Sequence, residues 1–172
     1  MENDKEQFPM ETRTDRDVRF VKVDGKERLQ DIRQLFREYA ESLEIDLCFQ
    51  NFEEELEALP GKYAAPEGTM ILALVDGESA GCIALRKSSE GIAEMKRLFV
   101  RDDYRGLHIG KRLVQLILME AAKLGYSYIR LDTLSTMKEA VSLYQSFGFY
   151  EIEPYIYNPI EDAKYMELKL EG

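Results

Sequence analysis

Residues 101–113 read RDDYRGLHIGKRL, with glycines at 106 and 110 and an apolar helical rhythm from Ile109 onward. The preceding residues 93–100, AEMKRLFV, alternate in the manner of a strand. A strand that turns directly into a helix points the free N–H groups of the first helical turn back over the end of its sheet. Those amides, the helix dipole and the close approach that glycine allows favour a bound anion such as phosphate. The stretch therefore predicts an anion site at one end of a sheet.

Two familiar phosphate motifs do not fit this spacing. The chain has no GxxxxGK[ST] Walker A loop here, and the glycines do not follow the GxGxxG pattern of a dinucleotide fold. Arg105 lies directly before the first glycine, where an always-charged guanidinium would add a clamp on the anion. Taken alone, this segment is equally compatible with an ordinary connection bounded by glycines. The elements on either side of it are therefore needed to distinguish a connection from an anion site.

Strand and helix patterns alternate around this stretch. Strands are expected over residues 17–23, 69–75, 79–85, 93–100, 128–133, 149–157 and 163–170, and helices over 28–43, 49–59 and 106–124, with a last helix that opens at the capping box Thr136-x-x-Glu139. Asp76-Gly77 is a strong hairpin signal between two of the strands. A strand reached through a helix implies a parallel neighbour for the strand at 93–100. The order predicts a mixed α+β domain.

Length and composition limit the organisation of the chain. A chain of 172 residues can bury one core and is too short for two ordinary domains. Residues 1–16 are polar and lack periodicity, so we expect a flexible segment before a single domain over 17–172. Cys48 and Cys82 form no disulfide or metal-binding pattern, and no apolar run suits a signal or a membrane span. We therefore expect a cytoplasmic protein without a metal or a membrane partner.

The formal net charge of -10 argues against a nucleic-acid partner, because such binding depends on clustered Lys and Arg. It suits a cationic small molecule instead. Acidic residues crowd the segment 41–57 and basic residues the segment 96–112. A solvated helix face explains the acidic run equally well, whereas the basic run is interrupted by the glycines of the predicted anion site.

The segment 105–110, RGLHIG, resembles the [RQ]-x-x-G-x-[GA] signature of the GNAT superfamily of N-acetyltransferases. The likeness extends from Ala93 to Phe149, and it includes the LYxxxGF pattern at residues 143–149. The N-terminal part fits in element order only. The resemblance implies the GNAT fold, a mixed sheet of six to seven mostly antiparallel strands with a splayed central parallel pair and about four helices. It also implies direct transfer of an acetyl group from acetyl-CoA to a primary amine of a small molecule or peptide.

The resemblance also implies which residues bind acetyl-CoA. The strand positions that bind the pantetheine arm through their backbone match Leu98, Phe99 and Val100. The loop that holds the pyrophosphate matches Arg105, Gly106, Leu107, His108, Ile109, Gly110 and Lys111. Two residues depart from the family pattern. His108 stands at the signature's first glycine, and Met137 stands where members with the fuller N-x-x-A-x-x-L-Y pattern have an asparagine that contacts the cofactor.

Tyr144 matches the tyrosine that many family members use as a general acid, which gives a proton to the departing coenzyme A thiolate. A core tyrosine on the row of Ala140, Leu143 and Phe147 is the alternative. For His108, our hypothesis is that the imidazole turns outward or contacts a phosphate or the 3′-phosphoadenosine end, and that it is not the base.

Glu94 is the candidate base, because it lies 11 residues before Arg105, where some family members have a catalytic glutamate. Strict alternation would put Glu94, Lys96 and Leu98 on one face of the strand and Met95, Arg97 and Phe99 on the other. A solvent-facing Glu94 that pairs with a lysine is the alternative.

The acceptor is the least determined part of the prediction. In the family, the first two helices and the last strand pair line the acceptor site, which here are the acidic segment 41–57 and the tyrosine-rich segment 154–159. Carboxylates and aromatic rings suit a polyamine, an amino-acid-like compound, an aminoglycoside or a peptide N-terminus. A catalytically degenerate acyl-CoA sensor or partner-binding module of the same fold remains an alternative, as does a nucleotide-binding regulator. Exposed edge strands also allow a homodimer.

Overall fold

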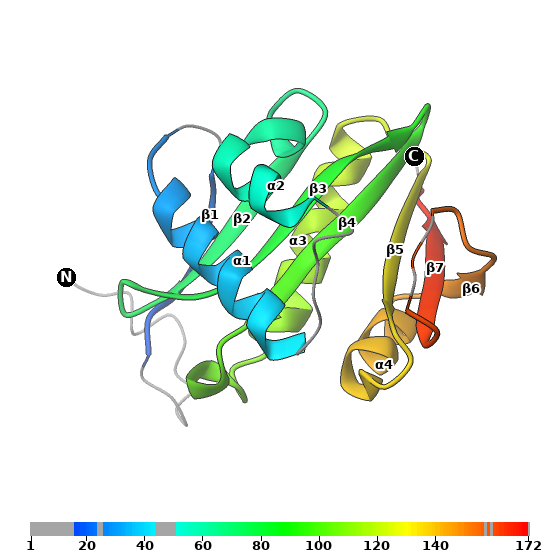
Figure 1. Cartoon of the computed structure of the whole chain (residues 1–172). Helices are drawn as coiled ribbons and strands as arrows, with labels where there is room; N and C mark the ends of the chain where they lie inside the picture. The colour runs from blue at the N-terminus through cyan, green and yellow to red at the C-terminus, as the bar shows by residue number, and fades with distance from the viewer. Residues whose placement is uncertain (1–15, 24–25, 44–50, 157, 159, 172) are drawn as a thin grey trace.

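The computed structural model describes residues 16–23, 26–43, 51–156, 158 and 160–171. Within these residues one sheet contains seven strands in the order β1-β2-β3-β4-β5-β7-β6 (Figure 1). The strands are β1 (Val18–Lys22), β2 (Thr69–Val75), β3 (Glu78–Ser89), β4 (Ile92–Val100), β5 (Tyr128–Leu134), β6 (Tyr150–Ile152) and β7 (Ala163–Lys169). The helices are α1 (Leu29–Leu43), α2 (Phe52–Ala58), α3 (Ile109–Lys123) and α4 (Lys138–Ser146), with short 3-10 turns η3 (Gly61–Tyr63) and η4 (Asp102–Tyr104).

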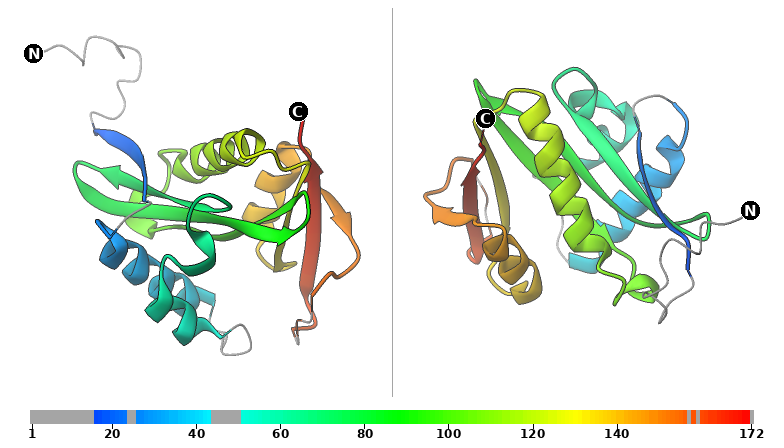
Figure 2. Two further views of the ribbon diagram at one scale, coloured as in Figure 1. Left: turned by 90° about the horizontal axis from the view of Figure 1, so that it is seen from above. Right: turned by 180° about the vertical axis from the view of Figure 1, so that it is seen from behind.

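The central strands are buried on both faces. α1 and α2 lie on one face of the sheet and α3 lies on the other, as the view from above in Figure 2 shows. Ile32, Phe36 and Leu56 pack on even-numbered residues of β2 and β3, whereas Leu113 and Ile117 of α3 pack on odd-numbered residues of the same strands. Period-2 alternation of apolar side chains on both sides explains why β2 is buried at every position.

The predicted mixed sheet with a parallel central pair is confirmed. β4 and β5 are parallel, and the other neighbouring strands are antiparallel. The expected elements are present in the expected order, with different ends. The strand expected over 149–157 is only three residues long, because Pro154 lacks the N–H that a strand needs and the chain leaves the sheet before it.

The expected start of α4 is wrong, whereas its expected buried row does pack against the core and is only partly buried. The helix begins at Lys138 with Met137 as its N-cap and without a side-chain cap, so Thr136 does not cap it. With this start, Glu139 is one position too early for a capping box. In the predicted buried row only Tyr144 is fully buried, while its three companions are half-buried.

The predicted flexible segment, residues 1–16, lies outside the described residues except for residue 16. In the part of the chain that the structure describes, no helix combines the length and the apolar character that a membrane span requires.

β4 carries a bulge that breaks its alternation. Cys82 pairs with Phe99 and Ala84 with Lys96, so β4 has one residue more than β3 between these pairs. Arg97, inside the bulge, has a positive φ of 63°. Phe99 packs with the α1 side of the sheet, and Leu98 and Val100 pack with the α3 side. The expected common face of Glu94, Lys96 and Leu98 is therefore wrong beyond Lys96.

β4 and β5 separate soon after they pair. Their ladder includes Ile92, Ala93 and Glu94 of β4, although β4 continues to Val100 and β5 to Leu134 (Figure 1). Beyond Glu94, the side of β4 that faces β5 has no strand ladder. Each backbone N–H and C=O on that side needs another hydrogen-bond partner, either water or a ligand.

Gly81 faces this part of β4, and its lack of a side chain is required for the packing. A Cβ built at Gly81 would lie 2.6 Å from the carbonyl oxygen of Phe99, a backbone atom that cannot rotate away. We expect Gly81→Ala to lower the free energy of unfolding by about 2 kcal/mol and the melting temperature by about 4–8 °C. Thermal unfolding followed by circular dichroism measures this.

Gly110→Ala is the matched control, because a Cβ there would meet only side-chain atoms at 3.8 and 3.9 Å. Its melting temperature should stay equal or rise. Equal melting temperatures for Gly81→Ala and the wild type would mean that β3 and β4 separate without cost.

Candidate active site

The loop before α3 has an unusual number of free backbone amides. The first helical hydrogen bond is donated by the N–H of Arg112 to the carbonyl of His108, 3.2 Å apart. The amides of residues 106–111 make no hydrogen bond within the described part of the chain. Gly106 has a φ of +88° and nothing within 4 Å of a built Cβ. Consecutive free donors at a helix N-terminus, with open space beside them, fit the pyrophosphate that the sequence predicts here.

His108 is the N-cap of α3 and has the left-handed backbone conformation, with φ 60° and ψ 29°. Its side chain is exposed and makes no capping hydrogen bond. Glycine adopts the left-handed conformation without strain, which explains why a glycine is expected at this position. The exposed side chain of His108 agrees with an imidazole that turns outward. Arg105 is also exposed, with ion pairs of 3.4 Å to Asp102 and 3.2 Å to Glu139 at the start of α4. Exposed pairs of this kind are weak and do not fix the guanidinium against a stronger anion.

A pocket opens where β4 and β5 separate. Its wall includes Tyr39 from α1, Lys96 and Leu98 from β4, Asp132 from β5, Tyr144 from α4 and Asn158 from the β6–β7 connection. Lys96 lies on the α1 face, because its cross-strand partner Ala84 belongs to that core, whereas Tyr144 belongs to the core on the α3 face. Side chains from both faces of the sheet therefore meet in one pocket, through the gap between the two strands.

Tyr144 has a free hydroxyl in this pocket. The residue is 7% exposed, and its ring packs edge-on against Phe149 with centroids 5.8 Å apart. Its hydroxyl makes no hydrogen bond within the described residues, although it lines the pocket. Burial raises the pKa of Tyr144, so the phenol keeps its proton at neutral pH. A buried donor without a partner is costly, and a ligand in the pocket would satisfy it.

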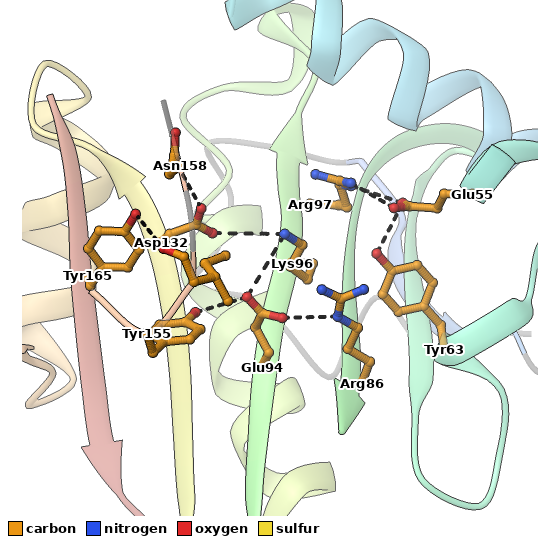
Figure 3. A network of polar contacts seen from close by, with 11 residues as sticks. Glu55, Tyr63, Arg86, Glu94, Lys96, Arg97, Asp132, Tyr155, Asn158 and Tyr165 are labelled. Carbon is orange, nitrogen blue, oxygen red and sulfur yellow. Dashed lines mark hydrogen bonds and ion pairs between the residues drawn. The ribbon is translucent and has the colours of Figure 1, made fainter. Parts of the chain in front are cut away.

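Glu94 is not solvent-facing. It is 2% exposed; Arg86 donates a hydrogen bond of 3.0 Å to one carboxylate oxygen and the Tyr155 hydroxyl donates one of 2.9 Å to the other (Figure 3). Burial alone would raise the pKa of Glu94, but the charges of Lys96 and Arg86 hold it below its ordinary value. Glu94 does not line the pocket, whereas its neighbour Lys96 does.

Lys96 and Asp132 also line the pocket, and we call these two residues the pocket floor. Neither was predicted from the sequence as a site residue. Lys96 Nζ lies 3.9 Å from Asp132 Oδ1 and 4.0 Å from Glu94 Oε2, and it makes no hydrogen bond within the described residues (Figure 3). Asn158 Nδ2 donates a hydrogen bond of 3.3 Å to Asp132 Oδ2. Charged residues inside two otherwise apolar strand patterns, AEMKRLFV and YIRLDT, were the signal in the sequence.

One residue of the acidic segment 41–57, Glu55, forms an ion pair with Arg97 of β4 and does not line the pocket. Glu55 of α2 accepts hydrogen bonds from Arg97 Nε at 3.0 Å and Nη2 at 2.7 Å, and a third of 3.0 Å from the Tyr63 hydroxyl. No acidic residue of that segment lines the pocket within the described residues, and residues 44–50 lie outside them. The pocket wall, with Lys96 and Arg97 on it, therefore does not reflect the negative charge of the whole chain.

The family model described as Acetyltransferase (GNAT) family matches residues 29–149, from α1 to the end of the LYxxxGF pattern. The chain belongs to the GNAT family. An uncharacterized N-acetyltransferase of Schizosaccharomyces pombe is 44% identical to this GNAT protein over 144 residues, which cover 83% of this chain and 88% of the relative. The sequence-based resemblance is thereby confirmed.

Solved structures agree with the fold. A GNAT-family acetyltransferase from Staphylococcus aureus Mu50 is similar to this GNAT protein with a TM-score of 0.75 and 20% identity, over 90% of this chain and 100% of that chain. A second structure is described as a streptothricin acetyltransferase from Bacillus anthracis in complex with acetyl coenzyme A. It has a TM-score of 0.56 and 26% identity, over 63% of this chain and 66% of that chain.

The left-handed backbone of His108 gives a stability prediction. A side chain in this conformation costs about 1 kcal/mol relative to glycine. We expect His108→Gly to raise the melting temperature by about 2–4 °C in thermal unfolding. His108→Ala keeps the Cβ and is the control, which should melt with the wild type. If both variants melt at the wild-type temperature, the conformation of His108 carries no cost.

Proposed function

We propose that this GNAT protein transfers the acetyl group of acetyl-CoA directly to a primary amine held in the pocket between β4 and β5. The observation that carries the proposal is the buried Tyr144, which lines a pocket shared by both faces of the sheet and whose hydroxyl has no hydrogen-bond partner among the described residues. The N-acetyltransferase names of relatives and the acetyl coenzyme A complex of a structural neighbour support the same activity.

The chain offers groups for each part of the cosubstrate. We propose that the free amides over Arg105 to Lys111 bind the pyrophosphate and that Arg105 adds a guanidinium contact. Leu98, Phe99 and Val100 lie in the part of β4 without a ladder toward β5, so the backbone groups of this stretch that point toward β5, and not those that pair with β3, are open to the amides of a pantetheine arm. Acetyl-CoA supplies the acetyl group as a thioester. β4 connects the loop before α3 with the pocket, because the strand ends at the loop and its residues 95–98 line the pocket.

Tyr144 is the proposed general acid. As the amine nitrogen bonds to the acetyl carbon and the carbon–sulfur bond breaks, the phenol gives its proton to the departing thiolate. The nitrogen then loses its second proton, which restores the phenol, so that the products are the amide and the free thiol. Its raised pKa keeps that proton available until charge develops on the sulfur. His108, exposed on the loop and absent from the pocket wall, has no proton-transfer role in this proposal.

The amine must lose a proton before it attacks, and two carboxylates are available. Glu94, the base predicted from the sequence, contacts Arg86, Lys96 and Tyr155 and is not part of the pocket wall. Asp132 lines the pocket, and among the described residues its single hydrogen bond comes from Asn158. We propose that Asp132 takes the proton and that Glu94 holds Lys96 and Arg86 in position.

Tyr144→Phe tests the acid. Because the hydroxyl makes no hydrogen bond in the described protein and the ring is kept, we expect an unchanged melting temperature and unchanged acetyl-CoA affinity by calorimetry. We expect kcat for amine acetylation, followed by thiol release, to fall about 100-fold or more. Tyr126→Phe, which removes a surface hydroxyl bonded to the Glu67 carbonyl, is the control.

Full activity in Tyr144→Phe would remove the phenol from the mechanism. A wild type that binds acetyl-CoA but acetylates no amine would instead favour an acyl-CoA sensor.

Asp132→Asn and Glu94→Gln separate the two carboxylates. We expect Asp132→Asn to lower kcat/KM about 100-fold. Glu94→Gln should keep kcat/KM near the wild-type value and lower the melting temperature at pH 7, because Arg86 and Lys96 lose a buried counter-ion.

The sign of the Glu94 effect follows from its lowered pKa. The ionised carboxylate stabilises the fold above the pKa of the unfolded chain, and this contribution is lost as the pH falls through the native pKa. The melting difference of Glu94→Gln should therefore shrink in acid. A large loss of kcat/KM in Glu94→Gln that Asp132→Asn does not share would make Glu94 the base.

A further inference from the structure

The ammonium of Lys96 is buried at the pocket and makes no hydrogen bond to any residue that the structure describes. Its side chain is 5% exposed, and its carboxylate neighbours, Glu94 and Asp132, lie 4.0 and 3.9 Å away. These distances are beyond hydrogen-bond length, and within the described residues nothing else accepts from Nζ. An ammonium has three donors, and leaving them unpaired in a buried site is costly. Lys96 lines the pocket, so a ligand oxygen can reach it.

The other charges of this network are more fully occupied than Lys96. Arg97 is held by both oxygens of Glu55, and Glu94 is held by Arg86 and by the Tyr155 hydroxyl. Burial and the nearby charge of Arg97 lower the pKa of Lys96 despite the two carboxylates. Its positive charge is thus incompletely compensated, and an anionic group of a ligand beside Nζ would stabilise it.

Asp132 offers the opposite charge directly beside Lys96. Its side chain is 10% exposed and lines the pocket. Asn158 donates to Oδ2, and Oδ1 faces Lys96 across 3.9 Å. A carboxylate has about four lone-pair sites, so Asp132 can accept further hydrogen bonds from an amine. Lys96 and Asp132 therefore place a cation and an anion side by side in the pocket wall (Figure 3).

We propose that the acceptor is an α-amino acid or a close analogue, whose carboxylate binds Lys96 and whose amine lies at Asp132. This inference rests on the acetyltransferase function proposed above and names its substrate class. An α-amino acid carries both groups on one carbon, which matches neighbouring opposite charges in the wall. The amine at Asp132 is then also beside the base proposed for its proton.

The other acceptor classes fit this floor poorly. A polyamine or an aminoglycoside brings further positive charge toward Lys96 in a buried site, where repulsion is screened little. A peptide N-terminus presents an amide beside its amine, with no charge for Lys96. Apolar residues such as Leu43, Leu134 and Ile160 also line the pocket, and they suit the apolar side chain of an amino acid.

Matched acceptors test the inference on the wild-type protein. Leucine, leucinamide and 3-methylbutylamine share one side chain, as do phenylalanine, phenylalaninamide and 2-phenylethylamine. Thiol release with acetyl-CoA gives kcat/KM for each compound. We expect each acid to exceed its amine and its amide about 10- to 100-fold, the size of one charge-assisted hydrogen bond. The amides have the least basic amines, so a larger free-amine fraction cannot explain a preference for the acids.

Lys96→Met then assigns the preference to its residue. Methionine has a similar length and suits a buried site, and we expect the ratio of kcat/KM for leucine to that for 3-methylbutylamine to fall toward 1. Lys87→Met is the control, because Lys87 on β3 pairs with exposed Glu67 and Glu90 away from the pocket. Its ratio should equal that of the wild type.

The outcomes separate the two proposals. If the wild type acetylates the amines or amides as well as the parent acids, the amino-acid inference is overturned and the acetyltransferase function stands. If acetyl-CoA binds but none of the six compounds releases thiol, while longer amines such as spermidine do, the inference is overturned in the same way. If acetyl-CoA does not bind at all, both proposals are overturned.

Discussion

The ladder between β4 and β5 ends after Glu94, and the site depends on that short parallel pairing. A continuous sheet would separate the side chains on the α1 face from those on the α3 face. Because the strands diverge, Tyr144 from one face and Asp132 from the other line the same pocket. Beyond the end of the ladder, the backbone N–H and C=O groups of β4 that point toward β5 have no strand partner, whereas elsewhere in the sheet neighbouring strands pair such groups. One change in strand direction thus produces both the cavity and the open edge beside it.

The bulge in β4 determines which charges surround that gap. By adding a residue after Lys96, it turns both Lys96 and Arg97 toward the α1 face, where strict alternation would separate them. Two neighbouring buried cations require counter-ions from several elements. α2 supplies Glu55 for Arg97, and Lys96 lies between Glu94 of its own strand and Asp132 of β5. The β6–β7 connection adds Tyr155 and Asn158 to the same two carboxylates, so distant parts of the chain are joined at the pocket floor.

The sequence predicted the order of the elements and the parallel pair, because apolar periodicity and the helix between two strands are local signals. It also predicted the turn from β4 into α3, since glycine spacing and a strand-to-helix turn occur within ten residues. The anion expected at this loop stays a prediction. The bulge was missed because its positive φ falls on Arg97, whereas glycine is the residue type that indicates a positive φ in a sequence. Lys96 and Asp132 were missed for a related reason. Their importance depends on a strand pairing that brings residues 36 positions apart within 3.9 Å, and a charge inside a strand pattern does not say which face it takes. Glu94 was selected by spacing alone, which carries no information on the partners that occupy its oxygens.

The exposure of the polar groups differs between the two ends of the site. At the loop before α3, Arg105 is 59% exposed, whereas the side chain of Lys96 at the pocket floor is 5% exposed. Dissolved salt screens charges that water reaches and has little access to buried ones. Ionic strength therefore acts mainly at the loop, where it weakens the attraction for anions, and leaves the charge pattern of the floor almost unchanged. A change of salt concentration would alter how strongly the loop attracts an anion without altering the charges that line the pocket.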